Sequence, residues 1–359
     1  MPKVTVAMAS YNHERFVGEA IESVLAQDGC DFDFIIVDDG SKDRTAEVIK
    51  EYKDPRIHFL PVEKNQGACV ALRRAIEGGK GEYVAILNSD DGFLPGKLKK
   101  QVDYLNRHPD IYAVFGQPRF IDEKGKSLRD KEHFCGQVFR QPNRTRQEWL
   151  NHFFYKYNAL CHPTVMLRRE CYHTLGYYDP RLAQTPDFDF WIRLTQQYDI
   201  HLMPEELIKY RILAGERNMS APNPSSCYRT HWEMLHCIRN YLQIKTIEDF
   251  IAKFPDEKAN VLVPDNDLVP YYLAKLAIRA SVDVKSVHHL FGLETLHSML
   301  QNSEMKAKLE RTLGFTYADF IELSGARSIF AVTPPRSFCR RLWDFGKKLT
   351  LAAKMKLQG

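Results

Sequence analysis

Two pairs of adjacent aspartates could do chemistry in this chain, and each pair follows a short apolar run. Asp38 and Asp39 follow the letters FIIV, and Asp90 and Asp91 follow YVAILNS. Runs of β-branched and aromatic residues that end in polar turn residues are typical of buried parallel strands. Ligands of open α/β sheets bind just beyond the carboxyl ends of such strands. We therefore expect these four carboxylates to line a ligand crevice.

Four carboxylates at one crevice repel one another unless a cation, a sugar hydroxyl or a base N–H lies among them. The cluster therefore indicates a site for a metal ion and a nucleotide. Neither a G-x-x-x-x-G-K-[ST] loop nor a G-x-G-x-x-G loop follows any predicted strand. The nucleotide is therefore not expected to be held as in ATPases or dehydrogenases.

The elements that must position these carboxylates alternate between strand and helix over about the first 120 residues. Apolar residues at helical spacing predict a helix over 13–27, and Ser41 is expected to cap the helix after the first acidic pair. This alternation predicts a mostly parallel α/β sheet covered by helices on both faces. Besides the two acidic strands, strands are expected at residues 4–9, 57–62, 111–116 and 164–167, with polar, irregular sequence over 117–160.

The character of the sequence changes at about residue 226. From there to about residue 330, apolar residues recur at helical spacing, beginning with Trp232 and Leu235. We predict an α/β domain over 1–225, an α-helical domain over 226–335 and a basic tail over 336–359.

Composition limits the remaining possibilities. The 359 residues are 44% hydrophobic and 27% charged, as in ordinary globular proteins, and the net charge of +4 gives no reason to expect a nucleic-acid partner. Eight cysteines contain no Cys-x-x-Cys pair, which favours free thiols in a reducing compartment. The N-terminal residues lack a signal-peptide profile, and no apolar run has the length of a membrane span. These features predict a cytoplasmic protein.

Taken together, the motifs resemble those of inverting family 2 glycosyltransferases with the GT-A fold. The resemblance covers roughly residues 1–220, with the motifs in the order and spacing of that family. It rests on ASYN at 9–12, IESVLAQ at 21–27, VDDGS at 37–41 with Asp43 and Thr45, NQG at 65–67, GEY at 81–83, NSDD at 88–91, HPT at 162–164 and the block 176–193.

The resemblance implies a nucleoside diphosphate sugar as donor, with a UDP-sugar favoured. Asp39 would accept the uracil ring N–H, and Tyr11 and the backbone near Ala9 would form the rest of the base pocket. Asp90 would lie near the ribose or the sugar. Asp91 would bind a divalent cation, Mn²⁺ or Mg²⁺, which suits a site with one or two carboxylates and phosphate oxygens. The resemblance also makes Asn65 and Arg73 donor-binding residues.

The same resemblance makes Asp187 the general base that deprotonates an acceptor hydroxyl, so that a single displacement inverts the anomeric carbon. Thr185 is expected to be the N-cap of a helix and Pro186 its first residue. Because Pro186 replaces the usual glutamate of the family, Asp189 is an alternative base. The acceptor would be a glycan or a polyprenyl-diphosphate-linked glycan of the cell envelope.

Two further departures from the family pattern affect these roles. Asn88 stands where many relatives have aspartate, so metal binding would depend more on Asp91. The loop that closes over the diphosphate lacks its usual histidine, and Arg217 is a candidate to supply positive charge there.

Other interpretations of the same residues stay open at this point. The acidic pairs could form plain turns, with Asp38 in a supporting role, and Asp187 could simply stabilise a helix dipole. Asp189 could pair with Arg193 four residues on, and His162 could be a structural histidine. A nucleotidyltransferase and a catalytically degenerate nucleotide-sugar-binding scaffold are the alternative functions.

The tail over 336–359 holds seven Lys or Arg and one Asp, interleaved with aromatic and aliphatic residues. Such a segment suits contact with an anionic membrane surface, which would place the protein on the inner face of the plasma membrane. A helix packed on the protein with a solvated basic side is the alternative.

Overall fold

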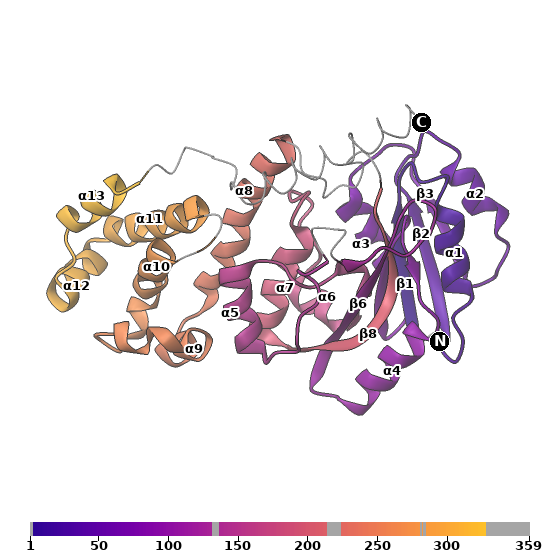
Figure 1. The fold of residues 1–359 in the computed structure, drawn as a ribbon. Coiled ribbons are helices and arrows are strands. Elements are labelled where there is room, and N and C mark those ends of the chain that lie inside the picture. Colours follow the sequence, from indigo (N-terminus) through magenta and orange to yellow (C-terminus); the bar gives the residue numbers. More distant parts are fainter. Residues whose placement is uncertain (1–2, 131–135, 214–223, 281, 283–284, 328–359) are drawn as a thin grey trace, which may run out of the picture. The chain divides into compact units, whose positions relative to one another are not determined.

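The structure is a computed structural model that describes residues 3–130, 136–213, 224–280, 282 and 285–327 (Figure 1). The chain divides into two compact units, Met1–Asn218 and Met219–Gly359. The domain boundaries expected at residues 225 and 335 remain predictions.

The first unit is built on an eight-stranded sheet with the order β3-β2-β1-β4-β7-β6-β8-β5. The neighbours β3, β2, β1 and β4 run parallel, whereas β7 is antiparallel to both β4 and β6. The strands are β1 Val4–Ser10, β2 Phe32–Asp38, β3 Ile57–Pro61, β4 Tyr83–Asn88, β5 Gly92–Phe93, β6 Ile111–Ile121, β7 Met166–Arg168 and β8 Asp199–Arg211.

Helices cover both faces of this sheet, as expected from the alternating pattern. Even-numbered residues of β1, such as Val6 and Met8, pack with Ile21 of α1 and Leu98 of α4 in one buried core. Helix α3 packs on the opposite face, where a Cβ on Gly78 would meet Ile35. The helices of this unit are α1 Val17–Leu25, α2 Thr45–Glu51, α3 Ala68–Gly78, α4 Lys97–Arg107, α5 Arg146–Lys156, α6 Glu170–Leu175 and α7 Pro186–Gln197, with a 3₁₀ turn, η2, at His162–Thr164.

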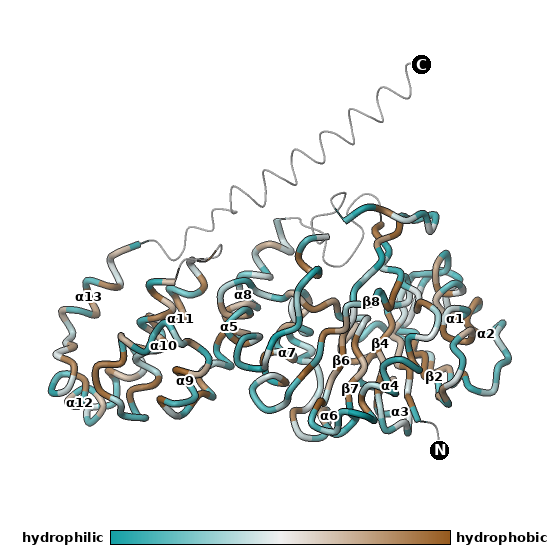
Figure 2. The backbone as a smooth tube through the Cα atoms, turned by 60° about the horizontal axis from the view of Figure 1, so that its bottom comes forward, coloured by the Kyte–Doolittle hydropathy of each residue, from teal (hydrophilic) through white to brown (hydrophobic). Residues whose placement is uncertain are grey.

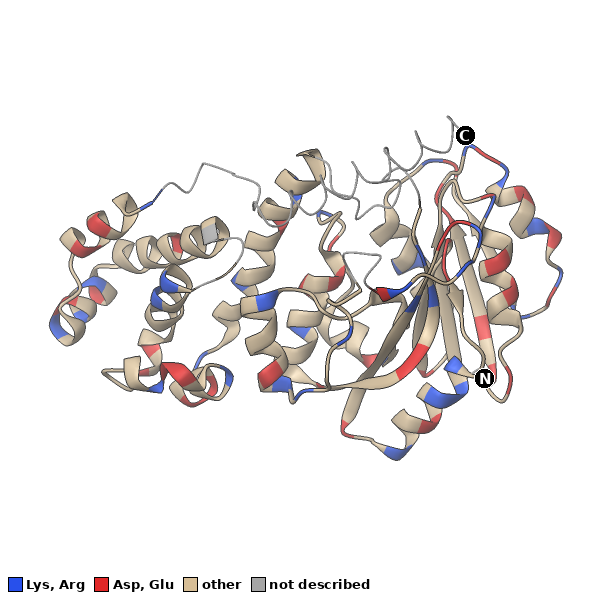
Figure 3. Ribbon diagram, in the orientation of Figure 1, with Lys and Arg blue, Asp and Glu red and all other residues tan. Residues whose placement is uncertain are grey.

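The distribution of hydropathy and charge agrees with this layering. Figure 2 shows hydrophobic residues concentrated in the strands and hydrophilic residues in the connecting loops. Charged residues of both signs lie interspersed along the helices, and most of the sheet carries none (Figure 3). The central strands β1, β2 and β4 therefore form a buried layer, whereas β3 and the middle of β8 are partly exposed.

Two local predictions were wrong. The segment 117–160 is more regular than its polar sequence suggested, since β6 continues to Ile121 and α5 begins after Thr145, which forms a capping box with Glu148. Ser41 does not cap α2, whose N-cap residue is Arg44. Instead, the Ser41 hydroxyl donates to the Asp38 carboxylate and accepts the N–H of Asn12, because those partners lie closer than the helix terminus.

The second unit is helical in its described residues, as the apolar spacing predicted. Its core contains large buried residues such as Tyr241, Phe250 and Phe291. The helices are α8 Pro224–Arg239, α9 Ile247–Lys253, α10 Val269–Arg279, α11 Lys285–Gln301, α12 Ser303–Leu313 and α13 Tyr317–Gly325, with 3₁₀ turns η3 Asn240–Gln243, η4 Pro255–Asn260 and η5 Asn266–Leu268.

Six cysteines lie in the described part of the chain, and all six are free thiols. Of these, Cys161, Cys171 and Cys237 are buried. Within the same residues, no helix combines the length and the apolar character required to cross a membrane.

A lone ammonium group is buried in the core beside the sheet. Lys97, at the start of α4, is fully buried, and its Nζ donates to Gln101 Oε1 at 2.7 Å and lies 4.3 Å from the centre of the Phe93 ring. Burial lowers the pKa of Lys97 from 10.5 to about 7. Desolvation of this charge therefore opposes folding whenever the amine is protonated.

We predict that Lys97→Met raises the free energy of unfolding at pH 7 by about 1–3 kcal/mol, because methionine fills the space without a charge. Between pH 7 and 10.5 the unfolded chain binds a proton that the folded chain does not, so wild-type stability rises with pH across this window. Lys97→Met removes that rise. Urea denaturation at pH 7 and pH 9 measures both effects, with the exposed Lys100→Met as control. A variant less stable than wild type at both pH values would contradict the prediction.

Candidate active site

The carboxyl ends of three parallel strands meet at one edge of the sheet. In the register of the strands, Ser10 at the end of β1 pairs with Asp38 of β2, and Ala9 pairs with Asn88 of β4. Both acidic pairs therefore follow strands that end side by side on either flank of β1. This is the arrangement in which open α/β sheets bind ligands.

The first acidic pair divides into two roles. Asp38 is buried and accepts from the backbone N–H and the hydroxyl of Ser41, so it closes a local turn. Asp39 is also buried, and its two carboxylate oxygens accept from the backbone N–H groups of Gln66 (2.9 Å) and Gly67 (2.8 Å). Asp39 therefore joins the end of β2 to the turn before α3.

Several residues near Asp39 are exposed to solvent. A Cβ on Gly40, which has φ +74°, would lie 2.9 Å from the backbone N of Asn65, so the two turns approach this closely only with glycine. Asn65 is exposed, and Tyr11 is 41% exposed. Ala9 is partly exposed. An exposed aromatic ring next to a strand end is suited to stacking on a flat base.

Arg73 has its main contacts away from the acidic pairs. Its guanidinium pairs with Glu77 at 2.8 Å on the same helix and lies 4.8 Å from the centre of the Tyr177 ring. These contacts join α3 to the loop before α7.

In the second acidic pair, Asp91 is buried and Asp90 is partly exposed. Asp91 is 2% exposed, and burial raises its pKa well above the usual aspartate range, with the neighbouring charge of Asp90 raising it further. Burial also raises the pKa of Asp90, against the opposing effect of positive charge on His13 and Arg211. The protein thus holds two negative groups where both are costly to ionise.

Asn88 eases this repulsion. Its side-chain amide donates to Asp91 Oδ2 at 2.9 Å. An aspartate at this position would add a third negative charge, whereas the amide supplies a donor. The departure from the family pattern therefore stabilises Asp91 as a carboxylate.

Arg211 holds the second acidic pair from the end of β8. Its backbone N–H donates to Asp91 Oδ1, and its guanidinium Nε donates to the carbonyl of Asp90, each at 2.8 Å. The same guanidinium pairs with Glu19 of α1 and donates to the carbonyl of Glu123 at 3.2 Å. The side chain is 2% exposed. One buried cation thus fixes the acidic turn to α1 and to the segment after β6.

The donor set around Asp91 fits a divalent cation bound together with a nucleotide. Within the described residues, no group of three or more His, Cys, Asp or Glu side chains could hold a metal. Burial raises the pKa of both Asp90 and Asp91, so an added positive charge would favour their ionised forms. A cation with Asp91 as ligand would supply that charge, and phosphate oxygens would have to complete its shell.

Asp187 lies in the first turn of α7, where Thr185 is the N-cap and Pro186 the first helical residue, as predicted. Its Oδ1 accepts the N–H of Phe188 at 2.8 Å, and its Oδ2 accepts the side-chain amide of Asn158 at 2.8 Å. The helix N-terminus also favours its negative charge.

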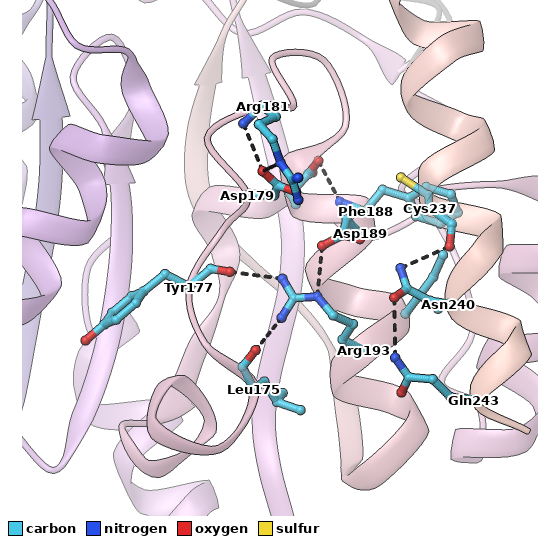
Figure 4. Close-up of polar contacts among 12 residues, drawn as sticks. Leu175, Tyr177, Asp179, Arg181, Phe188, Asp189, Arg193, Cys237, Asn240 and Gln243 are labelled. Carbon is cyan, nitrogen blue, oxygen red and sulfur yellow. Dashed lines mark hydrogen bonds and ion pairs between the residues drawn. The ribbon is translucent and has the colours of Figure 1, made fainter.

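Asp189 forms the i,i+4 ion pair with Arg193 that the sequence suggested, at 2.8 Å. Figure 4 shows Arg193 between Asp189 and the carbonyl groups of Leu175 (2.7 Å) and Tyr177 (3.0 Å). Asp189 therefore orients an arginine that secures the loop before α7. This engagement makes Asp189 a poorer candidate for a base than Asp187.

Behind Asp187 lies a buried aromatic cluster. His162 Nε2 lies 3.1 Å from the hydroxyl of Tyr178, which lies 3.2 Å from that of Tyr172. Burial lowers the pKa of His162 to about 4, so this histidine is neutral at physiological pH. Phe190 and Trp191 are fully buried in the same region. These contacts are those of a structural histidine, which was one of the interpretations of His162 from the sequence.

Two of the predicted features lie outside the described residues. These are Arg217, in the loop after β8, and the basic tail over 336–359.

Comparisons with known proteins decide the family. The sequence profile described as Glycosyl transferase family 2 matches residues 5–176. An uncharacterized glycosyltransferase of Methanocaldococcus jannaschii is 35% identical over 242 residues, which is 65% of this chain and 80% of that protein. The chain belongs to glycosyl transferase family 2.

Solved structures show that this family 2 chain has the GT-A fold. S. aureus TarS 1-349 in complex with UDP-GlcNAc matches with a TM-score of 0.55 at 16% identity, over 89% of each chain. The mannosyltransferase PcManGT of Pyrobaculum calidifontis, in complex with GDP-Man and Mn²⁺, matches with a TM-score of 0.50 at 16% identity, over 91% of this chain and 88% of that one. The predicted fold class is therefore confirmed.

The sequence interpretation missed two polar residues of this family 2 site. Arg211 was noted only as part of the segment 210–220, which resembles the closing loop. Its strand β8 carries several other charged residues, so no local signal distinguishes it. Asn158 lies in a stretch that looked irregular, and no pattern connects it with Asp187. Both residues act across large separations in sequence, which short motifs do not encode.

We predict that Arg211→Lys lowers the free energy of unfolding by about 2–4 kcal/mol, because a lysine ammonium cannot replace the planar guanidinium that donates to several buried acceptors. Urea denaturation measures this loss. Arg119→Lys is the matched control, since Arg119 pairs with Glu206 through a half-exposed side chain. Equal, small losses in both variants would show that Arg211 does not organise the acidic turn.

Proposed function

We propose that this chain transfers a sugar from a nucleoside diphosphate sugar to a hydroxyl of a glycan or lipid-linked glycan, with inversion at the anomeric carbon. The donor is a UDP-sugar. Asp187 is the general base, and Asp91 holds Mn²⁺ or Mg²⁺. Tyr11, Asp39 and the backbone near Ala9 form the base pocket, with Asn65, Arg73 and Asp90 as further donor-binding residues.

The acidic pair Asp90 and Asp91 carries this proposal. Burial raises the pKa of both groups, and the charge of Asp90 raises the pKa of Asp91 further, at an edge where three parallel strands end. A divalent cation would relieve that repulsion, and the oxygens of a diphosphate would complete its ligand shell. Further support comes from the ligands named for two proteins of the same fold, UDP-GlcNAc in TarS and GDP-Man with Mn²⁺ in PcManGT.

The mechanism follows from the groups available. A carboxylate oxygen of Asp187 accepts the proton of the acceptor hydroxyl, and the acceptor oxygen forms a bond to the anomeric carbon. The bond from that carbon to the diphosphate breaks, and its electron pair leaves with the nucleoside diphosphate. When bound, the divalent ion supplies positive charge that stabilises the leaving group. One displacement inverts the configuration.

We predict that the protein releases UDP or GDP from one member of a panel of nucleotide sugars in the presence of Mn²⁺ and an acceptor glycan. Asp187→Asn lowers the rate about 10²–10⁴-fold, because the amide cannot take the proton. Asp91→Asn abolishes release of the nucleotide. Asp103→Asn, on the half-exposed surface of α4, is the matched control and keeps the wild-type rate.

Each contrary outcome of this assay has a definite meaning. Full activity in Asp187→Asn would contradict the assignment of the base. Binding of the nucleotide sugar without release would favour a degenerate scaffold. Pyrophosphate formation from a nucleoside triphosphate would favour a nucleotidyltransferase.

We further propose that the acceptor is carried on a membrane lipid and that the basic tail brings the protein to it. Seven Lys or Arg in 336–359 would attract anionic lipids, each contributing about 1 kcal/mol near the surface. The full chain is then expected to sediment with vesicles containing phosphatidylglycerol at low salt, and a chain ending at residue 335 to remain in the supernatant. Equal sedimentation of both chains would contradict the proposed role of the tail in membrane binding.

A further inference from the structure

We propose that Asn158 is a positioning residue that holds the carboxylate of Asp187 in the orientation needed to accept the acceptor proton. The inference rests on the proposed role of Asp187 as base. It goes beyond that role by naming the group that fixes the base.

The side-chain amide of Asn158 has both ends engaged. Its Nδ2 donates to Asp187 Oδ2 at 2.8 Å, and its Oδ1 accepts the backbone N–H of Leu160 at 3.1 Å. Because the oxygen must face the Leu160 N–H, the amino group must face Asp187. The orientation of the amide is therefore determined by its own backbone.

Asp187 is thus held at both carboxylate oxygens by donors from different segments. Phe188 N–H reaches Oδ1 from α7, and Asn158 reaches Oδ2 from the segment after α5. Two donors from different segments fix the rotation of the carboxylate plane. A base prepared in this way needs no reorganisation when the hydroxyl arrives.

The backbone that delivers Asn158 is strained. Tyr157, the C-cap residue of α5, has φ +64° and ψ −158°, a region populated almost only by glycine. The preceding helix is braced on α7 by Phe153 and Phe188, whose rings meet edge to face at 5.7 Å. The chain therefore turns sharply beside the first turn of α7. Such strain persists only where the surrounding contacts impose it. The strained residue, Tyr157, immediately precedes Asn158, which contacts Asp187.

The two carboxylates of α7, Asp187 and Asp189, have hydrogen-bond partners of different charge. Asp189 faces the guanidinium of Arg193, a full positive charge. Asp187 faces a neutral amide. A neutral donor can orient a carboxylate with less loss of basicity than a cation would cause, because it brings no opposite charge. The amide is therefore suited to a base.

Two variants of the full chain test the proposal. Asn158→Ala removes the donor, and we expect kcat to fall 10- to 100-fold with the donor KM changed less than twofold. Asn158→Asp has the same shape and can still accept the Leu160 N–H, but it places a second carboxylate against Asp187. We expect a larger fall in kcat from this variant. Rates are measured as nucleotide release with the donor and acceptor that give wild type its highest rate.

A matched control separates catalysis from folding. Asn143 also accepts a backbone N–H, that of Leu202 at 2.8 Å, through its side chain. Asn143→Ala is expected to keep the wild-type kcat. Melting temperatures of all variants show which are folded, and Asn158→Asp serves as the test if Asn158→Ala does not fold.

A double variant decides between positioning and a merely structural role. In an Asp187→Asn background, Asn158→Ala should cause no further loss of kcat, because the group that it positions no longer acts. A further 10-fold loss in that background, or a wild-type kcat in a folded Asn158→Ala or Asn158→Asp variant, would overturn the proposal while Asp187 remained the base. Full activity in Asp187→Asn alone would instead contradict the proposed function.

Discussion

The burial of negative charge at the ends of parallel strands governs the polar organisation of the first unit. Asp91 is almost completely buried beside Asp90, and both pKa values are raised. The side-chain amide of Asn88 donates to Asp91. Two N–H groups of Arg211 also donate, one to each aspartate. These groups hold the acidic turn in place without cancelling its charge. A divalent cation would offset the remaining negative charge and would in turn bind the diphosphate oxygens.

The catalytic proposal depends on a similar distinction at α7. Two carboxylates lie in the first turn of one helix, and their partners differ: Arg193 for Asp189 and Asn158 for Asp187. The first arrangement secures a loop, and in the second a neutral amide donates to the carboxylate. This difference in environment assigns the roles better than the order of the residues along the chain.

Much of this architecture could be predicted from the sequence, because its signals are local. The apolar runs before each acidic pair identified β2 and β4, and the dipeptide Thr185-Pro186 identified the start of α7. A strand was expected at 164–167, where β7 lies, but its antiparallel direction between β4 and β6 could not be predicted, since a strand's own sequence does not encode its direction. The cap expected from Ser41 was wrong because its hydroxyl instead closes a local turn with Asp38. Arg211 and Asn158 were missed because their partners lie far away in the sequence. Such contacts depend on how strands are ordered, which is a property of the whole sheet.

The central claim is that the acidic turn binds a divalent cation together with a nucleoside diphosphate. Titration with Mn²⁺, followed by the loss of the free-ion signal in electron paramagnetic resonance, tests it directly. The account predicts one bound ion per chain in the presence of UDP, much weaker binding without UDP, and loss of this binding in Asp91→Asn. Equally tight Mn²⁺ binding by wild type and Asp91→Asn would contradict it.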